Sequence, residues 1–381
     1  MKKHKLVIGS VLKPVDDTRM YEKFGLSLDQ TTKYDINIIG FYTKKLPKGS
    51  NINFHPIFRF HRLSPSRLLA PSKFLKKLIE LKPEIVIVNS HELLTVTSLY
   101  KILFGAKIIY DVRENYFRNL LFTATFPLPF RPFLAGYVRA KEYLSTLLFD
   151  HYILAEKQYA EEFSFSQKKH TIIENKYLPH PHFESPKIRE KKSLKNSEKI
   201  RLIFSGTIAE STGVFEAISL AKKLHLLDPK IRLKIVGFCS LPETLKRVKM
   251  EVENHHFISL KGGDKLVSHQ TILSHIQEAD FGIICYPHNK STINSMPTKL
   301  YEYLGSHLPI ILQNHDRWVQ LCQQYNAGIT IDFDEVNPEE LLSKMKQTEN
   351  FYSTTPGEEI LWHSEENKLT NLIDLTINNN L

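Results

Sequence analysis

The 381-residue sequence has little cysteine and no long apolar run. Its three cysteines, Cys239, Cys285 and Cys322, are widely spaced, and each lies beside or within an apolar segment. We therefore expect buried free thiols in a reducing compartment, and neither a disulfide framework nor a zinc site. No stretch reaches the roughly 18 apolar residues that a membrane-spanning helix requires. The apolar run near the N-terminus is short and is broken at Gly9, which predicts a first buried strand rather than a signal peptide.

Acidic residues are fewer than basic ones, which gives a formal net charge of +10 and a pI near 9.2. This excess favours an anionic partner: nucleotide phosphates, an anionic lipid surface or nucleic acid. The basic residues are scattered over both halves of the chain, and no nucleic-acid-binding motif is recognisable. We therefore do not expect a nucleic-acid partner.

Short apolar runs alternate with segments of helical length along most of the chain. Because the runs are continuous rather than alternating, they predict strands buried on both faces of a parallel sheet. Their alternation with helices predicts βαβ units. The predicted strands are 5–10, 36–42, 84–89, 107–112, 152–155 and 171–175, then 201–206, 232–237, 257–262, 281–287, 309–313 and 328–331.

One polar stretch interrupts this rhythm. Residues 179–199 are rich in proline and lysine and show no periodicity, which is typical of a linker. The chain therefore divides into an N-terminal domain over 1–178 and a C-terminal domain over 200–359, with a tail over 360–381. The fold class is α/β, with two doubly wound Rossmann-like domains, in which ligands bind beyond the carboxyl ends of the strands.

The second domain begins with a strand, a short loop and a helix in RLIFSGTIAESTGVFEAISLAKKL (201–224). Gly206 ends the strand and Gly213 opens the helix. Such glycines allow backbone N–H groups to approach a phosphate at the positive end of the helix dipole. The spacing is not G-x-G-x-x-G, so the dinucleotide-binding fingerprint is absent. Either a tight βα turn or a phosphate site fits this stretch.

A second stretch, MPTKLYEYLGSHLPIIL (296–312), predicts a helix that starts at Pro297. Lys299 and Glu302 are three residues apart and share one helix face. They form either a weak surface ion pair or a ligand site. In the second case the ammonium meets a diphosphate and the carboxylate accepts hydrogen bonds from two ribose hydroxyls. The backbone N–H groups around Ser295 to Lys299 would then point toward the cleft.

Together these stretches resemble the C-terminal half of retaining glycosyltransferases of the GT-B type, the glycosyltransferase group 1 family. The resemblance rests on FSGTIAESTGVFEAI, RLKIVG, ADFGIICYP and MPTKLYEYLGSHLPIIL. It implies two Rossmann-like domains facing across a cleft, with Glu302 on the ribose of a sugar nucleotide and Gly206 and Thr207 at the diphosphate. Base contacts are expected near Gly262 and Gly263. The predicted donor-binding residues are Gly206, Thr207, Gly213, Gly262, Gly263, Asn294, Ser295, Met296, Pro297, Thr298, Lys299 and Glu302.

The sequence departs from the family pattern at several of these positions. Asn294 stands where many members have a glutamate, and His307 replaces the usual glycine before the closing strand. Thr207 and Thr212 stand where basic residues are common. Lys299 would therefore be the main side-chain cation at the diphosphate.

The first half resembles the family more loosely, in VDDTRMYEKFGLSL (15–28) and VNSHELLTVTSLYKILFGAKIIYDVRENY (88–116). Both stretches follow predicted strands, where functional residues are expected. Arg113 replaces the histidine that often touches the transferred sugar in the family. The stretch with His91 also fits a helix start capped by Asn89 or Ser90. The predicted catalytic residues are His91, Arg113, Glu114 and Asn294, and those of the acceptor side are Asp17, Arg19, Glu92 and Asn115.

Residues 117–149 mix aromatic, aliphatic and basic side chains, among them Arg118, Arg131, Arg139 and Lys141. This composition fits either a membrane interface or a lipid-linked acceptor site, or else helices packed on the sheet. The basic stretch 59–77 lies before it. One hypothesis is peripheral attachment to an anionic inner membrane.

The resemblance implies transfer of a hexose-type sugar from a nucleoside-diphosphate sugar to a glycan or lipid-linked acceptor, with retention. The expected setting is bacterial surface polysaccharide or glycolipid synthesis in the cytoplasm, without a metal or another cofactor. The tail ILWHSEENKLTNLI (360–373) resembles the family helix that crosses back to the first domain, although packing on its own domain fits equally. A sugar-nucleotide epimerase and a non-catalytic nucleotide-sugar-binding protein stay open as alternatives, the latter because of Thr207, Thr212 and Asn294.

Overall fold

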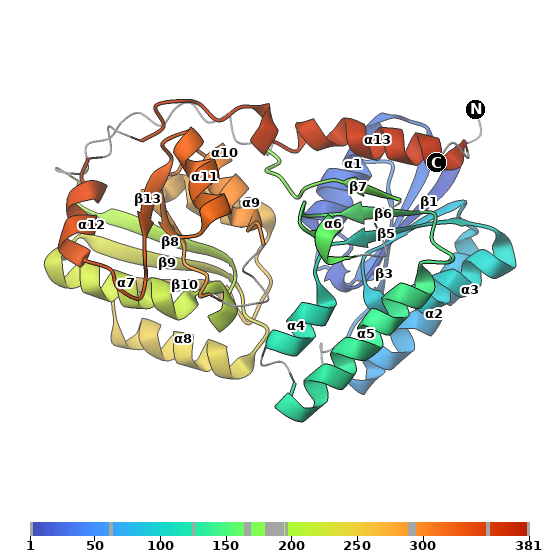
Figure 1. The fold of residues 1–381 in the computed structure, drawn as a ribbon, viewed down its shortest axis with the longest axis horizontal. Helices are drawn as coiled ribbons and strands as arrows, with labels where there is room; N and C mark the ends of the chain where they lie inside the picture. Colours follow the sequence, from blue (N-terminus) through green and yellow to red (C-terminus); the bar gives the residue numbers. More distant parts are fainter. Residues whose placement is uncertain are drawn as a thin grey trace. The chain divides into compact units, whose positions relative to one another are not determined.

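The computed structural model describes residues 3–60, 64–123, 126–163, 169–179, 194, 197–288, 295–347 and 351–378. The chain forms two compact units. The first comprises Met1–Asn175 and Trp362–Leu381, and the second comprises Lys176–Leu361. In each unit a sheet lies between layers of helices (Figure 1). Most of the predicted linker 179–199 falls outside the described residues.

The first unit is built on a seven-stranded sheet whose neighbouring strands are all parallel. The strand order is β3-β2-β1-β4-β5-β6-β7. At its centre β4 is buried along its whole length, as its continuous apolar run predicts. The strands are β1 (His4–Pro14), β2 (Tyr34–Phe41), β3 (Asn53–Phe58), β4 (Ile85–Val88), β5 (Lys107–Val112), β6 (His151–Leu154) and β7 (His170–Ile172).

Helices cover both faces of this sheet (Figure 1). One layer contains α2 (Ala70–Leu81), α3 (Leu94–Phe104) and α5 (Arg131–Ser145), with α4 (Tyr116–Phe122) beside α5. The helical turn η1 (Thr18–Gly25) and α1 (Leu26–Gln30) pack against the C-terminal helix α13 (His363–Ile377). The shorter elements are η2 (Pro65–Leu69), η3 (His91–Leu93), η4 (Leu128–Phe130) and α6 (Tyr159–Glu162).

The C-terminal helix belongs to the first unit although its residues come last in the chain. Trp362, just before α13, is fully buried, and its Nε1 donates a hydrogen bond to Ser27 Oγ at 3.0 Å. Its ring stacks on Phe24 with centroids 5.9 Å apart. A carboxylate oxygen of Glu365 accepts the backbone N–H of Glu174. These contacts fix α13 on the first unit.

The second unit contains a six-stranded parallel sheet in the order β10-β9-β8-β11-β12-β13. Separate apolar clusters fill the spaces on its two faces. All six strands match runs predicted from the sequence. They are β8 (Ile200–Thr207), β9 (Ile231–Phe238), β10 (Ile258–Gly263), β11 (Phe281–Ile284), β12 (Ile310–Gln313) and β13 (Gly328–Ile331). Its helices are α7 (Val214–Leu227), α8 (Pro242–Asn254), α9 (His269–Glu278), α10 (Thr298–Gly305), α11 (Asp316–Gln324) and α12 (Pro338–Met345), with the turns η7 (Glu210–Thr212) and η9 (Glu358–Ile360).

The strand order of the second unit reverses at β8, which lies between β9 and β11. Ligands of doubly wound sheets bind at such a switch point, beyond the carboxyl ends of the strands. Three glycines stand side by side there, since Gly206 on β8 pairs with Gly237 on β9, and Gly237 pairs with Gly262 on β10. A Cβ atom on Gly237 would lie 1.7 Å from the carbonyl oxygen of Gly206. The ends of β8, β9 and β10 therefore lie closer together than they could if these positions carried side chains.

Over the described ranges, no helix combines the length and apolar character needed to cross a bilayer.

Candidate functional site

The helix α10 is docked on the switch point of the second sheet by Tyr303. The ring of Tyr303 packs against Gly282 on β11, where a Cβ atom would lie 2.5 Å from the ring. Its hydroxyl lies 2.9 Å from Ser205 Oγ and accepts the Ser205 backbone N–H at 3.3 Å. Lys299 precedes Tyr303 by one helical turn and therefore points at the same strand end. Tyr303 thus positions Lys299 beside Gly206.

The side chain of Lys299 is buried, with only 6% of the residue exposed. Its Nζ lies 4.0 Å from the centroid of the Phe204 ring and 5.3 Å from that of Tyr286. No hydrogen-bond partner for this ammonium exists among the described residues. Burial lowers the pKa of Lys299 to about 8, although Cys285 and Glu302 oppose the shift. A buried cation with cation–π contacts and no hydrogen bond is suited to an anionic ligand.

Gly206 leaves space for such a ligand. Its φ of +95° is in the region that favours glycine, and within the described part of the chain the one atom that a Cβ there would approach is Cε of Lys299, at 3.8 Å. The neighbouring Thr207 is exposed. A phosphate group could therefore reach the end of β8 and the Lys299 side chain together.

Gly213 has a structural role that differs from the prediction. Its N–H donates to the carbonyl oxygen of Glu210, so it does not point at a ligand. A Cβ atom on residue 213 would lie 1.9 Å from the carbonyl oxygen of Cys285, so this position requires glycine because the backbone of Cys285 packs against it. Thr212, where the family often has a cation, donates its hydroxyl to the carbonyl oxygen of Thr207 at 2.8 Å. This loop is held by its own hydrogen bonds and by the ion pair of Glu210 with Arg247.

Glu302 lies one turn beyond Lys299, and its Oε1 is 3.2 Å from Nε2 of His269. His269 is the first residue of α9, whose start is capped by the Ser268 side chain. Sequence reasoning missed His269, although a histidine just after a cap and near the glycines at the end of β10 was a usable signal. The contact fixes the carboxylate of Glu302 at the same edge of the sheet as Gly262.

The remaining predicted donor-binding residues belong to the same unit as Lys299 and Glu302. Gly263 has φ +81°, and its carbonyl oxygen accepts the N–H of Cys239. The carbonyl oxygen of Ser295 accepts a hydrogen bond from Trp318 Nε1 at 2.8 Å, which anchors the approach to α10. Met296 and Pro297 follow, and Thr298 begins the helix. Asn294 lies outside the described residues.

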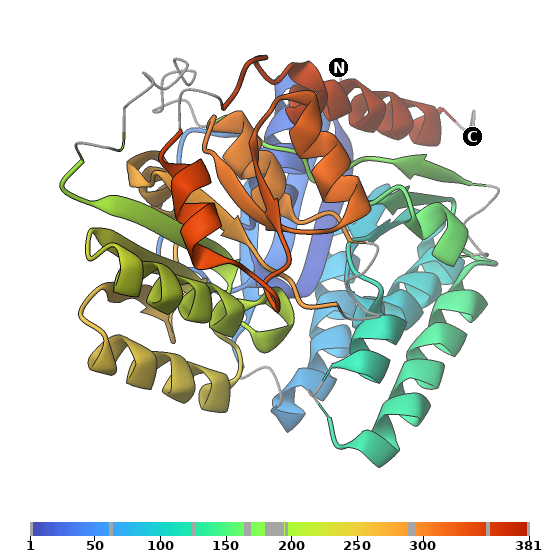
Figure 2. The same ribbon diagram turned by 60° about the vertical axis from the view of Figure 1, so that its left-hand side comes forward.

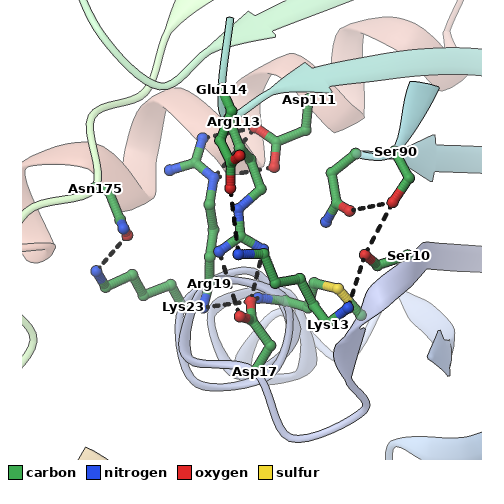
Figure 3. Close-up of polar contacts among 12 residues, drawn as sticks. Ser10, Lys13, Asp17, Arg19, Lys23, Ser90, Asp111, Arg113, Glu114 and Asn175 are labelled. Carbon is green, nitrogen blue, oxygen red and sulfur yellow. Dashed lines mark hydrogen bonds and ion pairs between the residues drawn. The ribbon is translucent and has the colours of Figure 1, made fainter. Parts of the chain in front are cut away.

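The predicted rim of the first unit separates into two clusters. In the first, Arg113 binds Asp17 with both terminal nitrogens, at 2.8 and 3.3 Å (Figure 3). Asp17 also accepts the backbone N–H groups of Arg19 and Met20, and so caps the turn that follows β1. Although burial opposes the shift, Arg113 holds the pKa of Asp17 at about 2. Lys13 Nζ lies 3.3 Å from Glu114 Oε1 beside this pair.

Arg19 does not line an open rim, contrary to the prediction. It is 1% exposed and donates to both oxygens of Asp111 and to the carbonyl oxygen of Ile173. Asn115 is also buried, where its side chain caps α4 and donates to Glu162. Both residues stabilise the first unit, because their side chains form hydrogen bonds with other residues of that unit.

The second cluster contains His91, Glu92 and Arg67. Arg67 forms an ion pair with Glu92, and Nε2 of His91 lies 3.6 Å from the same carboxylate. Burial lowers the pKa of His91 to about 4, so its ring is neutral near pH 7. Its Nδ1 is buried without a hydrogen-bond partner in the part of the chain that the structure describes. Ser90 does not use its hydroxyl to cap η3, because that oxygen accepts the N–H of Val11.

Known proteins show the same architecture. Residues 186–351 match the family model for glycosyl transferases group 1. This segment is a group 1 glycosyltransferase domain. The comparison with curated protein sequences gave no match.

Solved structures resemble the chain over nearly its whole length. Sucrose-phosphate synthase from Thermosynechococcus elongatus matches with a TM-score of 0.70 at 11% identity, over 98% of this chain and 99% of that one. WaaG, a glycosyltransferase involved in lipopolysaccharide biosynthesis, matches with a TM-score of 0.66 at 13% identity, over 97% and 99%. HepE from Anabaena, in complex with UDP, matches with a TM-score of 0.63 at 12% identity, over 97% and 99%. The two Rossmann-like units of the chain thus have the GT-B fold predicted from the sequence.

Proposed function

We propose that the chain transfers a sugar from a nucleoside-diphosphate sugar to a glycan or lipid-linked acceptor, with retention of the anomeric configuration. The observation that carries the proposal is the buried Lys299 ammonium beside Gly206, one turn from Glu302. In this proposal the donor diphosphate lies against Lys299 and the end of β8. The ribose hydroxyls donate to Glu302, which His269 orients.

The proposed reaction breaks the bond between the sugar C1 and the diphosphate and forms a bond from C1 to an acceptor oxygen on the same face. The acceptor proton passes to the departing diphosphate. Negative charge develops on that diphosphate, and a preformed cation in a site with little water stabilises it strongly. Lys299 would supply this stabilisation, because Thr212 has its hydroxyl engaged within its own loop.

The acceptor side is proposed to lie in the first unit, around His91, Arg113 and Glu114. Because its pKa is low, His91 would act there as a neutral hydrogen-bonding group rather than as a cation. Surface polysaccharide or glycolipid synthesis in a bacterium is the proposed setting, at the cytoplasmic side of the membrane. The likeness to WaaG, which is involved in lipopolysaccharide biosynthesis, supports this setting.

The test is a thermal-shift scan with UDP, GDP, ADP and TDP, alone and as their sugars. One nucleotide series should raise the unfolding temperature, because a ligand that binds the folded state stabilises it by mass action. Glu302→Ala should abolish that shift. Turnover of the matching sugar nucleotide, followed by NMR of the product anomer, tests transfer and retention. If no nucleotide gives a shift at any concentration, the proposal fails.

A non-catalytic nucleotide-sugar-binding protein is the second candidate. Thr207 and Thr212 replace basic residues near the diphosphate position, and Arg113 is held by Asp17. A donor that stabilises the chain but is not consumed with any acceptor would favour this candidate.

A further inference from the structure

The outward face of α5 is apolar along the whole helix. The exposed large side chains on it are Phe133 (80% exposed), Tyr137 (62%), Tyr143 (64%) and Leu144 (67%), and Leu147 (86%) follows just beyond the end of the helix. The other exposed positions of the helix are Pro132, Gly136 and Ala140, so its exposed positions carry no charge. Because one helix face repeats every three to four residues, these side chains form one stripe roughly 20 Å long.

The stripe continues onto neighbouring elements. At the N-terminal end of α5, Leu128 and Phe130 of η4 are 71% and 61% exposed. On the adjacent helix α3, Ile102 and Leu103 are 66% and 61% exposed. We call the stripe and these four residues the apolar face. Figures 1 and 2 show α3 and α5 side by side on the outside of the first unit.

The three elements that form this face, α3, η4 and α5, expose no carboxylate. Neither α3 nor η4 contains an acidic residue, and the one carboxylate of α5, Glu142, is buried. Lys141 lies beside the stripe, with its Nζ 4.8 Å from the Tyr137 ring. Lys73 and Lys76 are exposed on α2, the helix next to α3.

Two of the arginines that the sequence placed in this region point inward instead. Arg118 forms an ion pair with Glu162, and Arg139 forms one with the buried Glu142. Arg67, in the preceding basic stretch, binds Glu92. Arg131, at the start of α5, donates to the carbonyl oxygen of Phe126. The other cations at the apolar face are lysines, whose flexible stems can follow a surface while the ammonium stays in water.

We propose that the apolar face docks on an anionic lipid bilayer, with α5 lying in the plane of the interface. Aromatic and leucine side chains enter the boundary between headgroups and acyl chains, and the lysines meet lipid phosphates. A second copy of the chain is a poorer occupant. A two-fold interface places the same patch against itself, so the lysines of one copy would face those of the other.

Docking brings the bilayer near the acceptor residues, because α5 contacts η3, which contains His91 and Glu92. An acceptor carried by a lipid would reach the first unit beside this contact. This consequence rests on the proposed function, whereas the docking itself does not.

The test is cosedimentation of the full chain with vesicles of phosphatidylcholine and phosphatidylglycerol, compared with pure phosphatidylcholine. We expect salt-sensitive binding to the mixed vesicles. Phe133→Ser with Leu147→Ser should weaken it about tenfold or more, because two large apolar side chains no longer enter the interface. The matched control is Leu226→Ser with Met250→Ser, which removes exposed apolar side chains from the second unit and should leave binding unchanged.

A charge reversal tests the lysines. Lys73→Glu with Lys76→Glu should weaken binding to the mixed vesicles, whereas Lys246→Glu with Lys249→Glu on α8 should not. In each pair the two lysines are exposed and three residues apart, and both variants change the net charge by the same amount.

Equal losses of binding in the two variants, or no vesicle binding by the parent chain, would overturn the proposal. A solution dimer that Phe133→Ser with Leu147→Ser dissociates, without vesicle binding, would overturn it in favour of self-association. The nucleotide-induced thermal shift should be the same in all these variants, which separates this test from that of the donor site.

Discussion

Lys299 holds its ammonium 4.0 Å from the centre of the Phe204 ring, at the strand end where Gly206 leaves open space. The ring face partly compensates the buried charge, because its quadrupole attracts cations. No hydrogen bond to the ammonium from the described part of the chain completes this compensation. An arrangement that is unfavourable without a ligand and favourable with an anion is typical of a binding site rather than of a structural lysine.

Removing this charge should make the protein more stable and should weaken its binding of the donor. Lys299→Met keeps an apolar stem of similar length and removes the buried cation. We expect the free energy of unfolding at pH 7 to rise by on the order of 1–3 kcal/mol, while affinity for the nucleoside diphosphate falls at least about tenfold. Denaturant unfolding and calorimetric titration measure the two effects. A variant that is less stable than the parent would contradict the argument.

The affinity for a nucleoside diphosphate should fall as the pH rises above about 8. The pKa of Lys299 is lowered to about 8 by burial, so the ammonium loses its proton above that pH. A bound diphosphate favours the charged form, and binding then takes up a proton between pH 8 and the ordinary lysine pKa of about 10.4. Titrations of the parent chain from pH 7 to about 10 test this dependence. The same series with Lys299→Met should be flat.

Glu302→Gln should weaken binding of nucleotides but not of inorganic pyrophosphate. If the carboxylate accepts hydrogen bonds from ribose hydroxyls, its loss affects a ligand with a ribose by about 1.5–3 kcal/mol. Pyrophosphate has no ribose and should compete equally well in the variant and the parent. Competition calorimetry distinguishes the two ligands. Equal weakening of both would place Glu302 at the phosphates and refute its assignment to the ribose.

Tyr303→Phe should loosen the position of Lys299. The change leaves the buried Ser205 hydroxyl without the Tyr303 oxygen at 2.9 Å, so we expect a loss of about 1–2 kcal/mol in the free energy of unfolding. Donor affinity should fall with it, because Lys299 is one turn away on the same helix. Ser205→Ala combined with Tyr303→Phe is the control, since losses that simply add would mean that the two hydroxyls do not interact.

Much of the fold could be predicted because buried parallel strands have a clear pattern. All six strands of the second sheet and six of the seven in the first coincide with apolar runs. The missed strand, β3, is at the sheet edge, has no long apolar run and contains Pro56. Edge strands are half-exposed, and proline is tolerated there, so their sequences resemble loops. A search for continuous apolar runs therefore misses a strand such as β3, most of whose residues are not buried.

The candidate site was only partly predictable, because side-chain contacts depend on register between distant elements. The spacing of Lys299 and Glu302 predicted one helix face. It did not predict the docking of that helix through Tyr303, or the burial of the ammonium against Phe204. Arg19 was assigned to an open rim since it follows a strand end, but it is paired with Asp111, which is 92 residues later in the sequence. Gly213 was predicted to lie in a phosphate-binding turn, but its N–H donates a hydrogen bond to the carbonyl oxygen of Glu210.

The pair of Arg113 and Asp17 should make stability depend on pH in acid. The pKa of Asp17 is about 2 in the folded chain, below the value near 4 expected when unfolded, because Arg113 outweighs the effect of burial. The stabilisation is therefore present above about pH 4 and is lost as the pH falls toward 2, with a total of about 2 kcal/mol. Asp17→Asn should flatten the pH dependence of the free energy of unfolding in this range. Asp16→Asn is the control, because that carboxylate accepts a hydrogen bond from Thr43 instead, and the slope should persist. If both variants keep the parent's slope, the ion pair does not contribute to stability as its geometry indicates.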